Sequence, residues 1–311
     1  MSTVAAIDCG TNSIRLLIAE PDGDGLRDLE RQMRIVRLGQ GVDARGEFAP
    51  EALARTFAAV DEYAALIQQH NVQRVRFVAT SATRDAGNRQ LFIDGIQARH
   101  GVLPDVVPGT EEAALSFAGA ASVLADLAED PVLVVDLGGG STEFVVGNRH
   151  GVSAAKSVDM GCVRFTERYL RSDPPTAAEV SAARDEAERI IASVAVEVPL
   201  ASVSRVIGVA GTVTTVTAHA LELPRYLPDA IHGAVVSLDR LEAAADSLLA
   251  MDRQSRAELP YMHPGRVDVI GAGSLLWRTI LVELNRLSGG RITQATTSEH
   301  DILDGIALGI R

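Results

Sequence analysis

The stretch that decides the fold is Val132-Leu133-Val134-Val135-Asp136-Leu137-Gly138-Gly139-Gly140-Ser141-Thr142. Its plan occurs a second time near the start of the chain, as Val4-Ala5-Ala6-Ile7-Asp8-Cys9-Gly10-Thr11-Asn12-Ser13. In each copy a short apolar run ends in Asp and is followed by Gly and hydroxyl residues, a pattern typical of a buried strand that leads into a tight turn. Successive backbone N–H groups in such a turn form an anion-binding concavity. The repeat predicts two related domains that face one phosphate-bearing ligand.

The segments around both copies alternate between strand and helix patterns. The expected strands are residues 4–8, 14–20, 31–38, 74–79, 102–107, 132–137, 143–146 and 203–209. The expected helices are residues 50–70, 109–127, 176–198, 238–251, 274–287 and 298–310. Strands that alternate with helices predict an α/β fold. We expect one domain over residues 1–120, completed by the C-terminal helix 298–311, and a second over residues 121–297.

Composition excludes several classes of protein. The chain has 311 residues, which suits two domains. Its net charge of -12 opposes general binding to nucleic acid or to an acidic membrane surface. No apolar run is long enough to span a bilayer and no signal peptide precedes the first strand. Two cysteines, Cys9 and Cys162, are too few for a disulfide framework, so a cytoplasmic location is expected. Lys156 is the only lysine, and the P-loop motif is absent.

Glycine followed by a hydroxyl residue is expected at four strand ends: Gly10-Thr11, Gly138 to Thr142, Gly211-Thr212 and Gly273-Ser274. One such turn alone is common in α/β proteins, but the Asp-containing pair is much more specific. Ligands of open sheets bind at the carboxyl ends of strands. The expected phosphate-binding residues are Gly10, Thr11, Asn12, Ser13, Arg84, Gly138, Gly139, Gly140, Ser141, Gly211 and Thr212. Asp136 and Asp8, at the two strand ends, are the expected carboxylates for Mg²⁺ or another divalent cation. Glu143 flanks the second turn and, from the residues alone, is also consistent with an ordinary strand residue that faces solvent.

Two adjacent carboxylates, Glu111 and Glu112, lie at the start of an expected helix. Acidic residues in a first helical turn commonly just complement the helix dipole. Beside two phosphate-binding turns, a carboxylate can instead deprotonate a water for attack on phosphorus, and a neighbouring like charge and burial raise its pKa toward a useful range. Arg84 follows a strand end and can clamp phosphate through two hydrogen bonds. Arg15 is a weaker candidate for the same role.

In this order, the motifs resemble the exopolyphosphatase/guanosine pentaphosphatase (Ppx/GppA) family. They are Ile7 to Ser13, Ala79 to Ala86, Gly109 to Ala113, Val135 to Glu143, Met160 to Val163, and Ala210 to Thr212. The resemblance implies two ribonuclease-H-like domains of the actin-like ATPase superfamily, with the active site in the cleft between them. It is to the short, two-domain form, without the further C-terminal helical domains of longer relatives.

The resemblance also implies roles for individual residues. Glu112 corresponds to the family's catalytic base, and Glu111 is the neighbouring member of its Glu-Glu-Ala motif. Asp136 and Glu143 correspond to residues tied to magnesium and activity, and Arg84 corresponds to a phosphate contact. The expected activity is release of terminal orthophosphate from inorganic polyphosphate by metal-assisted attack of water.

Three alternatives remain open from the sequence. The first is hydrolysis of the 5′-terminal phosphate of guanosine pentaphosphate, although aromatic residues that could line a pocket for the base make up only 4% of the chain. The second is a small-molecule kinase, which the Glu-Glu-Ala motif opposes because a kinase must exclude water. The third is a sensor that binds polyphosphate or a guanosine alarmone, and an alarmone could also act as an inhibitor. Family members are often dimers, so a homodimer is expected.

Overall fold

The computed structural model describes residues 3–23, 25–121 and 130–310. The chain divides into two compact units, Met1–Gly119 with Ile302–Arg311, and Ala120–Asp301. Within the three described ranges, no helix combines the length and the apolar character needed to cross a membrane.

The described residues of the first unit contain one five-stranded sheet in the order β3-β2-β1-β4-β5. Its strands are β1 (Val4–Cys9), β2 (Ser13–Asp22), β3 (Gly25–Ile35), β4 (Arg74–Ala79) and β5 (Asp105–Val106). The first three strands are antiparallel neighbours, while β1, β4 and β5 run parallel. The helices of this unit are α1 (Val42–Arg45), α2 (Pro50–Gln69), α3 (Ser81–Asp85), α4 (Arg89–His100), α5 (Gly109–Ala120) and α13 (Ile302–Leu308).

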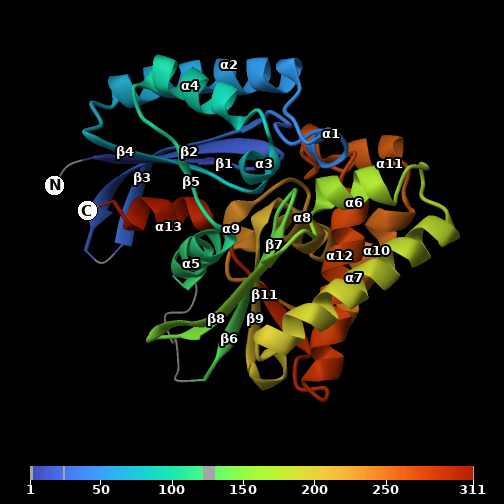
Figure 1. Ribbon diagram of the computed structural model, residues 1–311. Coiled ribbons are helices and arrows are strands. Elements are labelled where there is room, and N and C mark those ends of the chain that lie inside the picture. Colours follow the sequence, from blue (N-terminus) through green and yellow to red (C-terminus); the bar gives the residue numbers. More distant parts are fainter. Residues whose placement is uncertain (1–2, 24, 122–129, 311) are drawn as a thin grey trace. The chain divides into compact units, whose positions relative to one another are not determined.

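Strand alternation places one apolar set on each face of this sheet. Ile7, Leu16 and Phe77 pack with α2 and α4 on one face, and Figure 1 shows both helices along that face. Ala6 and Leu17 pack with Ile302, Leu303 and Ile306 of α13 on the other. The C-terminal helix is therefore part of the core of the first unit.

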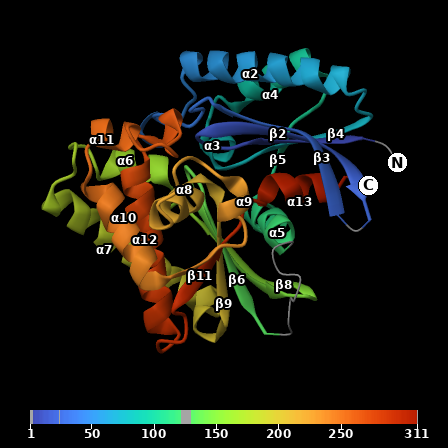
Figure 2. The same ribbon diagram turned by 180° about the vertical axis from the view of Figure 1, so that it is seen from behind.

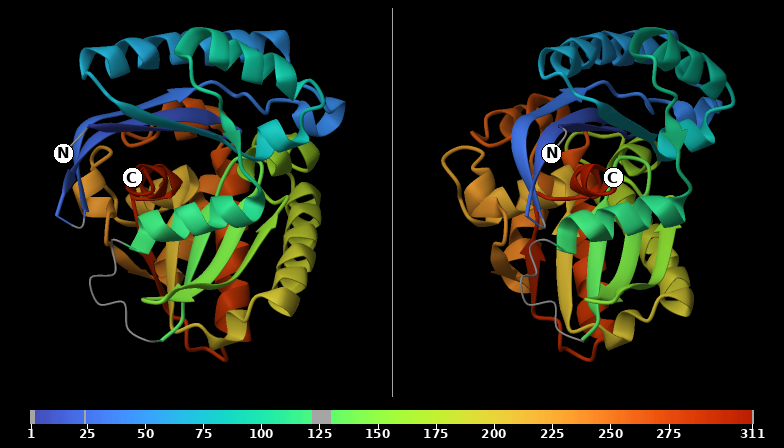
Figure 3. Two further views of the ribbon diagram at one scale, coloured as in Figure 1. Left: turned by 60° about the vertical axis from the view of Figure 1, so that its left-hand side comes forward. Right: turned by 90° about the vertical axis from the view of Figure 1, so that its left-hand side faces the viewer.

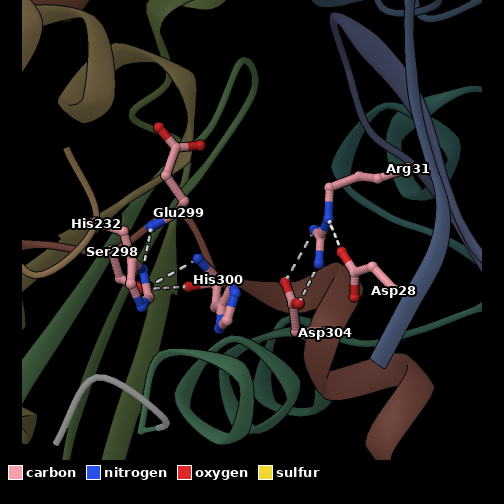
Figure 4. Close-up of polar contacts among 7 residues, drawn as sticks. All are labelled: Asp28, Arg31, His232, Ser298, Glu299, His300 and Asp304. Atoms are coloured by element: carbon pink, nitrogen blue, oxygen red, sulfur yellow. Dashed lines mark hydrogen bonds and ion pairs between the residues drawn. The ribbon is translucent and has the colours of Figure 1, made fainter. Parts of the chain in front are cut away.

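A polar contact also attaches α13 to β3. Arg31 donates to Asp304 at 2.5 and 3.3 Å and to Asp28 at 2.8 Å, as Figure 4 shows. Hydrogen bonds and charge from both carboxylates raise the pKa of Arg31 against the opposing effect of burial. Asp304 is itself buried, so its carboxylate is largely shielded from solvent in this ion pair.

The described residues of the second unit contain a six-stranded sheet in the order β10-β11-β9-β6-β7-β8. Its strands are β6 (Val132–Leu137), β7 (Thr142–Asn148), β8 (Gly151–Val158), β9 (Arg205–Val209), β10 (Val235–Ser237) and β11 (Gln294–Thr297). Its helices are α6 (Cys162–Arg168), α7 (Ala177–Glu197), α8 (Ala210–Ala220), α9 (Pro228–Ile231), α10 (Leu238–Ala250), α11 (Arg253–Ala257) and α12 (Ile270–Leu287). Leu133, Val135 and Phe144 of the sheet pack with Ile191 of α7 and Trp277 of α12; α10 and α12 are clearest in Figure 2.

Both sheets follow one plan, which Figure 3 shows from two further sides. Read from the strand that carries the Asp-Gly turn, β1 and β6 each have an antiparallel hairpin on one side and a parallel strand on the other. The second sheet adds β10, which is antiparallel to β11. The prediction of an α/β fold built from two ribonuclease-H-like domains is confirmed.

Several predicted elements are correct in type but differ in extent. The strand at 31–38 begins earlier, at Gly25, because β3 pairs with the whole of β2. The strand at 102–107 is only Asp105–Val106. The helix from 109 is described to Ala120, and the predicted part at 122–127 lies outside the described residues. The helix predicted from residue 176 is present as α7, and a capping box formed by Thr176 and Glu179 opens it.

The final helix begins at Ile302, not at Ser298. Ser298 instead forms a local turn in which its hydroxyl donates to the carbonyl of His300 and accepts from the amide of the same residue. The prediction of a strand-end turn at Gly273-Ser274 is wrong, because both residues lie inside α12. Leu276, Ile280 and Leu284 recur at helical spacing there and bury one face of the helix.

Candidate active site

The two turns that follow Asp8 and Asp136 share one backbone hydrogen bond. The amide of Gly10 donates to the carbonyl of Ser13 at 3.0 Å, and the amide of Gly138 donates to the carbonyl of Ser141 at 3.0 Å. Each turn connects the first two strands of its sheet. An added Cβ on Gly138 would lie only 3.1 Å from the Ser141 carbonyl, so glycine relieves a close approach at this position.

The turn of the second unit is held from one side by the start of α6. The amides of Cys162 and Val163 donate to the carbonyls of Gly138 and Gly139 at 3.0 and 2.9 Å, and Arg164 Nε donates to the carbonyl of Gly140 at 2.9 Å. Because C=O and N–H point in opposite directions across a trans peptide, the next amides, of Gly139, Gly140 and Ser141, face away from α6. These three N–H groups form the kind of concavity that binds an anion.

The turn of the first unit is supported in the same way by the segment after β3. The amides of Val36 and Arg37 donate to the carbonyl of Asn12 at 3.1 and 2.9 Å, and the amide of Gly39 donates to the carbonyl of Thr11 at 2.9 Å. The amides of Asn12 and Ser13 therefore point away from this support. Both predicted phosphate-binding turns thus present N–H groups on one side.

The strand-end aspartates have different cross-strand partners in the two units. Asp8 lies opposite Arg15, which donates to its Oδ2 from Nε at 3.0 Å and from Nη2 at 2.6 Å. Asp136 lies opposite Glu143, and both carboxylates are buried. Directly opposed residues project from the same face of a sheet, where two like charges destabilise the pair. The strand-end aspartate is therefore opposite an arginine in the first unit and opposite a second carboxylate in the second unit.

The donor set at Asp136 and Glu143 fits a hard divalent cation. Magnesium is usually bound by one or two carboxylates, with water and substrate phosphate completing the coordination. Ser157, opposite Glu143 on β8, donates to its Oε1 at 2.6 Å and orients that carboxylate. Within the described ranges no group of three or more His, Cys, Asp or Glu side chains is arranged to hold a metal alone. Asp8, which was also an expected metal ligand, lies in the first unit, where its carboxylate pairs with Arg15.

Glu112 is a buried carboxylate at the start of α5, with 7% of its surface exposed. Its Oε2 accepts from Arg84 Nη1 at 2.6 Å, and the same nitrogen donates to the carbonyl of Val107 at 3.0 Å. Burial raises the pKa of Glu112, the charge and hydrogen bond of Arg84 lower it, and the charge of Asp8 raises it. The net direction is upward, toward the range in which a carboxylate accepts a proton from water.

Glu111 does not share this environment. Its side chain is 43% exposed and pairs with Arg76 at 2.6 Å, which also contacts Asp105 at 3.1 Å. The sequence suggested that a neighbouring like charge would raise the pKa of Glu112. In the structure that charge comes from Asp8, and Glu111 is not among the main causes. The structure thus separates the two adjacent carboxylates into a buried group and a surface ion pair.

The predicted turn at Gly211-Thr212 lies at the beginning of α8, directly after β9. The guanidinium of Arg266 covers Gly211, where an added Cβ would come within 2.5 Å of its Cζ, and Arg266 Nη1 donates to Thr215 Oγ1 at 3.1 Å. Thr212 packs against Gly273 of α12. Gly211 and Thr212 therefore lie beside a cation, although α8 itself was not predicted.

Three polar residues near these turns were missed by the sequence reasoning: Arg164, Ser157 and Arg266. Each acts on a partner far away in sequence or on a neighbouring strand, so no local motif marks it. Cys162 is buried, and burial raises the pKa of its thiol to about 11, which keeps the thiol protonated.

Comparison with known proteins gives the family. Residues 17–309 match the model of the Ppx/GppA phosphatase family. Exopolyphosphatase 2 of Mycobacterium tuberculosis is 50% identical over 321 residues, covering 100% of this chain and 99% of that protein. A guanosine-5′-triphosphate,3′-diphosphate pyrophosphatase of Photobacterium profundum is 28% identical, over 95% of this chain and 58% of its own length.

Solved structures agree. The crystal structure of an exopolyphosphatase-like protein superposes with a TM-score of 0.95 at 45% identity, covering 99% of this chain and 97% of that one. The Aquifex aeolicus family member gives a TM-score of 0.80 at 28% identity, covering 99% and 96%. The chain belongs to the Ppx/GppA phosphatase family, and the prediction of a phosphatase of this family is confirmed.

Proposed function

We propose that this protein is an exopolyphosphatase that releases terminal orthophosphate from inorganic polyphosphate. The observation that carries the proposal is the buried carboxylate of Glu112, whose pKa is raised and whose position is fixed by Arg84. The same unit holds a phosphate-type turn at Gly10 to Ser13, and the charge of Asp8, just before that turn, acts on Glu112. Full-length similarity to a mycobacterial exopolyphosphatase supports the substrate class.

Glu112 acts as the general base. Its carboxylate takes a proton from water as the water oxygen bonds to the terminal phosphorus, and the P–O bond to the rest of the chain breaks. The terminal phosphate leaves as orthophosphate, and the shortened chain carries away the electron pair of the broken bond. Positioning and charge stabilisation supply most of the acceleration in phosphoryl transfer.

Arg84 has a free edge for the substrate. Its two hydrogen bonds both start from Nη1, and within the described part of the chain Nε and Nη2 have no partner. The Nε–Nη2 edge of a guanidinium matches two oxygens of one phosphate. Arg84 would thus hold the base from one side and the substrate from the other.

The turns supply further donors. The amides of Asn12 and Ser13 and those of Gly139 to Ser141 face away from their supports and would bind phosphate oxygens. Asp136 and Glu143 would hold magnesium or a similar divalent cation, which supplies neutralising charge to phosphate oxygens. Ser157 keeps the Glu143 carboxylate oriented for that purpose.

A cytoplasmic homodimer remains part of the proposal. It is supported by the family resemblance and by two cysteines that are both buried and free, as a reducing compartment leaves them. Hydrolysis of guanosine pentaphosphate is the competing activity within the family, and an alarmone could also inhibit. Sedimentation velocity and inhibition by the alarmone are the direct measurements for these points.

The experiment that tests the proposed function is orthophosphate release by wild-type protein and by Glu112→Gln, with magnesium and polyphosphate. Glutamine keeps the shape but cannot accept the proton, so kcat falls by about 100-fold or more. Glu111→Gln is the matched control, since it removes a neighbouring carboxylate from an exposed ion pair and retains most activity. Near-normal turnover by Glu112→Gln would remove this residue from the mechanism.

A further inference from the structure

The first unit contains a polar cavity of about 300 Å³ that the proposed mechanism does not use. It is lined by Gln40, Arg45, Ala49, Glu51, Ala52 and Arg55. Gln40 lies just before α1, Arg45 ends α1, Ala49 precedes α2, and the other three residues lie in the first turns of α2. Figure 1 shows α1 and the start of α2 at the same end of the first unit as α3, which follows the carboxyl end of β4.

The two arginines of this cavity form no ion pair with a carboxylate of the described residues. Arg45 Nη2 donates to the carbonyl of Gln40 at 2.9 Å, and Arg55 Nε donates to the carbonyl of Val36 at 2.8 Å. Within the described residues neither guanidinium contacts an acidic side chain. Among the described lining residues, Glu51 alone is acidic. In a chain with a net charge of -12, two such arginines in one cavity favour an anionic ligand.

The cavity is joined to the phosphate-type turn of the same unit through one residue. Val36 donates its amide to the carbonyl of Asn12 at 3.1 Å and accepts from Arg55 at its own carbonyl at 2.8 Å. Since the amide and carbonyl of one residue are only a few bonds apart, Arg55 Nε lies within roughly 10 Å of the Asn12 carbonyl. Val36 lies on the side of the turn opposite to the phosphate-facing amides of Asn12 and Ser13, so an anion bound at those amides reaches the cavity only if it is long enough to continue around the turn.

The character of the lining decides what kind of anion fits. No aromatic side chain lines the cavity, so it offers no stacking surface for a nucleotide base. Guanidinium groups pair well with the oxygens of phosphate. A chain of phosphates without a base is the ligand that these side chains suit.

We propose that this cavity is an extension subsite that binds phosphates of a polyphosphate chain beyond those held at the reaction centre. The inference rests on the proposed function. Arg45 and Arg55 supply the binding charge, and Glu51 weakens binding through repulsion. The subsite gives the protein a preference for long-chain polyphosphate over tripolyphosphate, because only the longer chain reaches it.

The test compares kcat/KM for long-chain polyphosphate with kcat/KM for tripolyphosphate, at fixed magnesium and low salt. Arg45→Gln and Arg55→Gln each lower the ratio of these two values by about three- to fivefold, the effect of one exposed charge pair. Glu51→Gln raises the ratio. Added salt reduces all three differences because exposed charges are screened.

Arg27→Gln is the matched control. It removes the same positive charge from the first unit at the far end of the β2–β3 hairpin, where Arg27 pairs with Glu20 and not with the cavity. The control keeps the wild-type ratio. A ratio that stays at the wild-type value in the three cavity variants would overturn the subsite. An equal loss on both substrates would also overturn it, since Arg55 would then act by supporting the Asn12 turn through Val36.

Direct binding separates failure of the subsite from failure of the proposed function. If wild-type protein releases no orthophosphate from either substrate, the proposed activity fails, and titration calorimetry with long-chain polyphosphate then tests the cavity alone. Weaker binding to Arg45→Gln and Arg55→Gln than to Arg27→Gln supports the subsite in that case. Equal binding to all three rejects it.

Discussion

Removal of Arg84 should shift the pH dependence of the reaction. Burial and the charge of Asp8 raise the pKa of Glu112, and Arg84 opposes both. In Arg84→Ala the two larger upward effects remain, opposed only by the smaller effect of the Thr80 hydrogen bond, so more of Glu112 is protonated at neutral pH and cannot act as a base. The rate therefore falls at neutral pH and recovers as the pH is raised, and the acid limb of the kcat profile moves to higher pH.

The size of this effect follows from the contact that is lost. Arg84 Nη1 meets Glu112 Oε2 at 2.6 Å, and the two side chains are 23% and 9% exposed, so the pair is only partly screened by water. A hydrogen bond to a charged group contributes about 1.5–3 kcal/mol. Since about 1.4 kcal/mol corresponds to a factor of ten in ionisation, the base is depleted by about 10- to 100-fold at a pH below its pKa.

The assay is orthophosphate release from polyphosphate between acid and alkaline pH, with kcat and KM determined at each pH. Arg84→Lys is the control, because lysine keeps a positive charge near Glu112 while losing the forked edge that binds phosphate. It should raise KM with less movement of the acid limb. If Arg84→Ala raises KM equally at every pH and leaves the acid limb in place, Arg84 contacts substrate but does not set the state of Glu112.

Three further perturbations follow from the same structure. The folded-state pKa of Glu112 is raised, so wild-type protein loses stability as the pH rises through that pKa. Glu112→Gln avoids this loss, so its Tm in calorimetry, relative to that of the wild type, should increase from acid to neutral pH. A Tm difference that stays constant with pH would contradict the burial argument. Glu143→Gln should raise the magnesium concentration that gives half-maximal rate by about tenfold or more. Ser157→Ala should raise it by less, because this change removes only the 2.6 Å hydrogen bond to Glu143. An unchanged magnesium requirement in Glu143→Gln would exclude this carboxylate as a ligand. Gly161→Ala places a Cβ 2.3 Å from the backbone of Gly139, so it should lower the free energy of unfolding in urea by about 1–3 kcal/mol and slow turnover. Gly25→Ala is the control, because its added Cβ would have its nearest contact at 3.7 Å and should change neither quantity. Equal behaviour of the two variants would show that the turn tolerates displacement.

The sequence predicted best those features that depend on local pattern. The apolar runs of β1 and β6 are buried along their whole length, and the Asp-Gly turns follow them as expected. The capping box at Thr176 and the apolar spacing of α2 depend on neighbours within a few residues, so they too could be predicted. The duplicated sheet follows from two copies of one local pattern.

Elements formed through tertiary pairing were harder to predict. β8 has few strongly apolar residues and is mostly half-buried, and it is a strand because β7 pairs along it. α8 is rich in Thr and Val, which have low helix propensity, yet it is helical and largely buried after β9. Gly273-Ser274 had the composition of a turn, but the apolar face of α12 determined the structure.

The candidate site divides in the same way. Asp8, Glu112 and Asp136 could be selected because each belongs to a recognisable motif. The distinction between buried Glu112 and exposed Glu111 required the fold, since adjacent residues of a helix point in different directions. Arg164 and Arg266 contact turns that are remote in sequence, so no spacing rule could have identified them.

The most direct test of the central claim is parallel measurement of orthophosphate release from polyphosphate and from guanosine pentaphosphate by wild-type protein with magnesium. The account predicts rapid release from polyphosphate, little from the nucleotide, and loss of the polyphosphate activity in Glu112→Gln. Rapid release from guanosine pentaphosphate with little from polyphosphate would contradict the proposed substrate. Release from neither would contradict the role assigned to Glu112 and leave a polyphosphate- or alarmone-binding sensor.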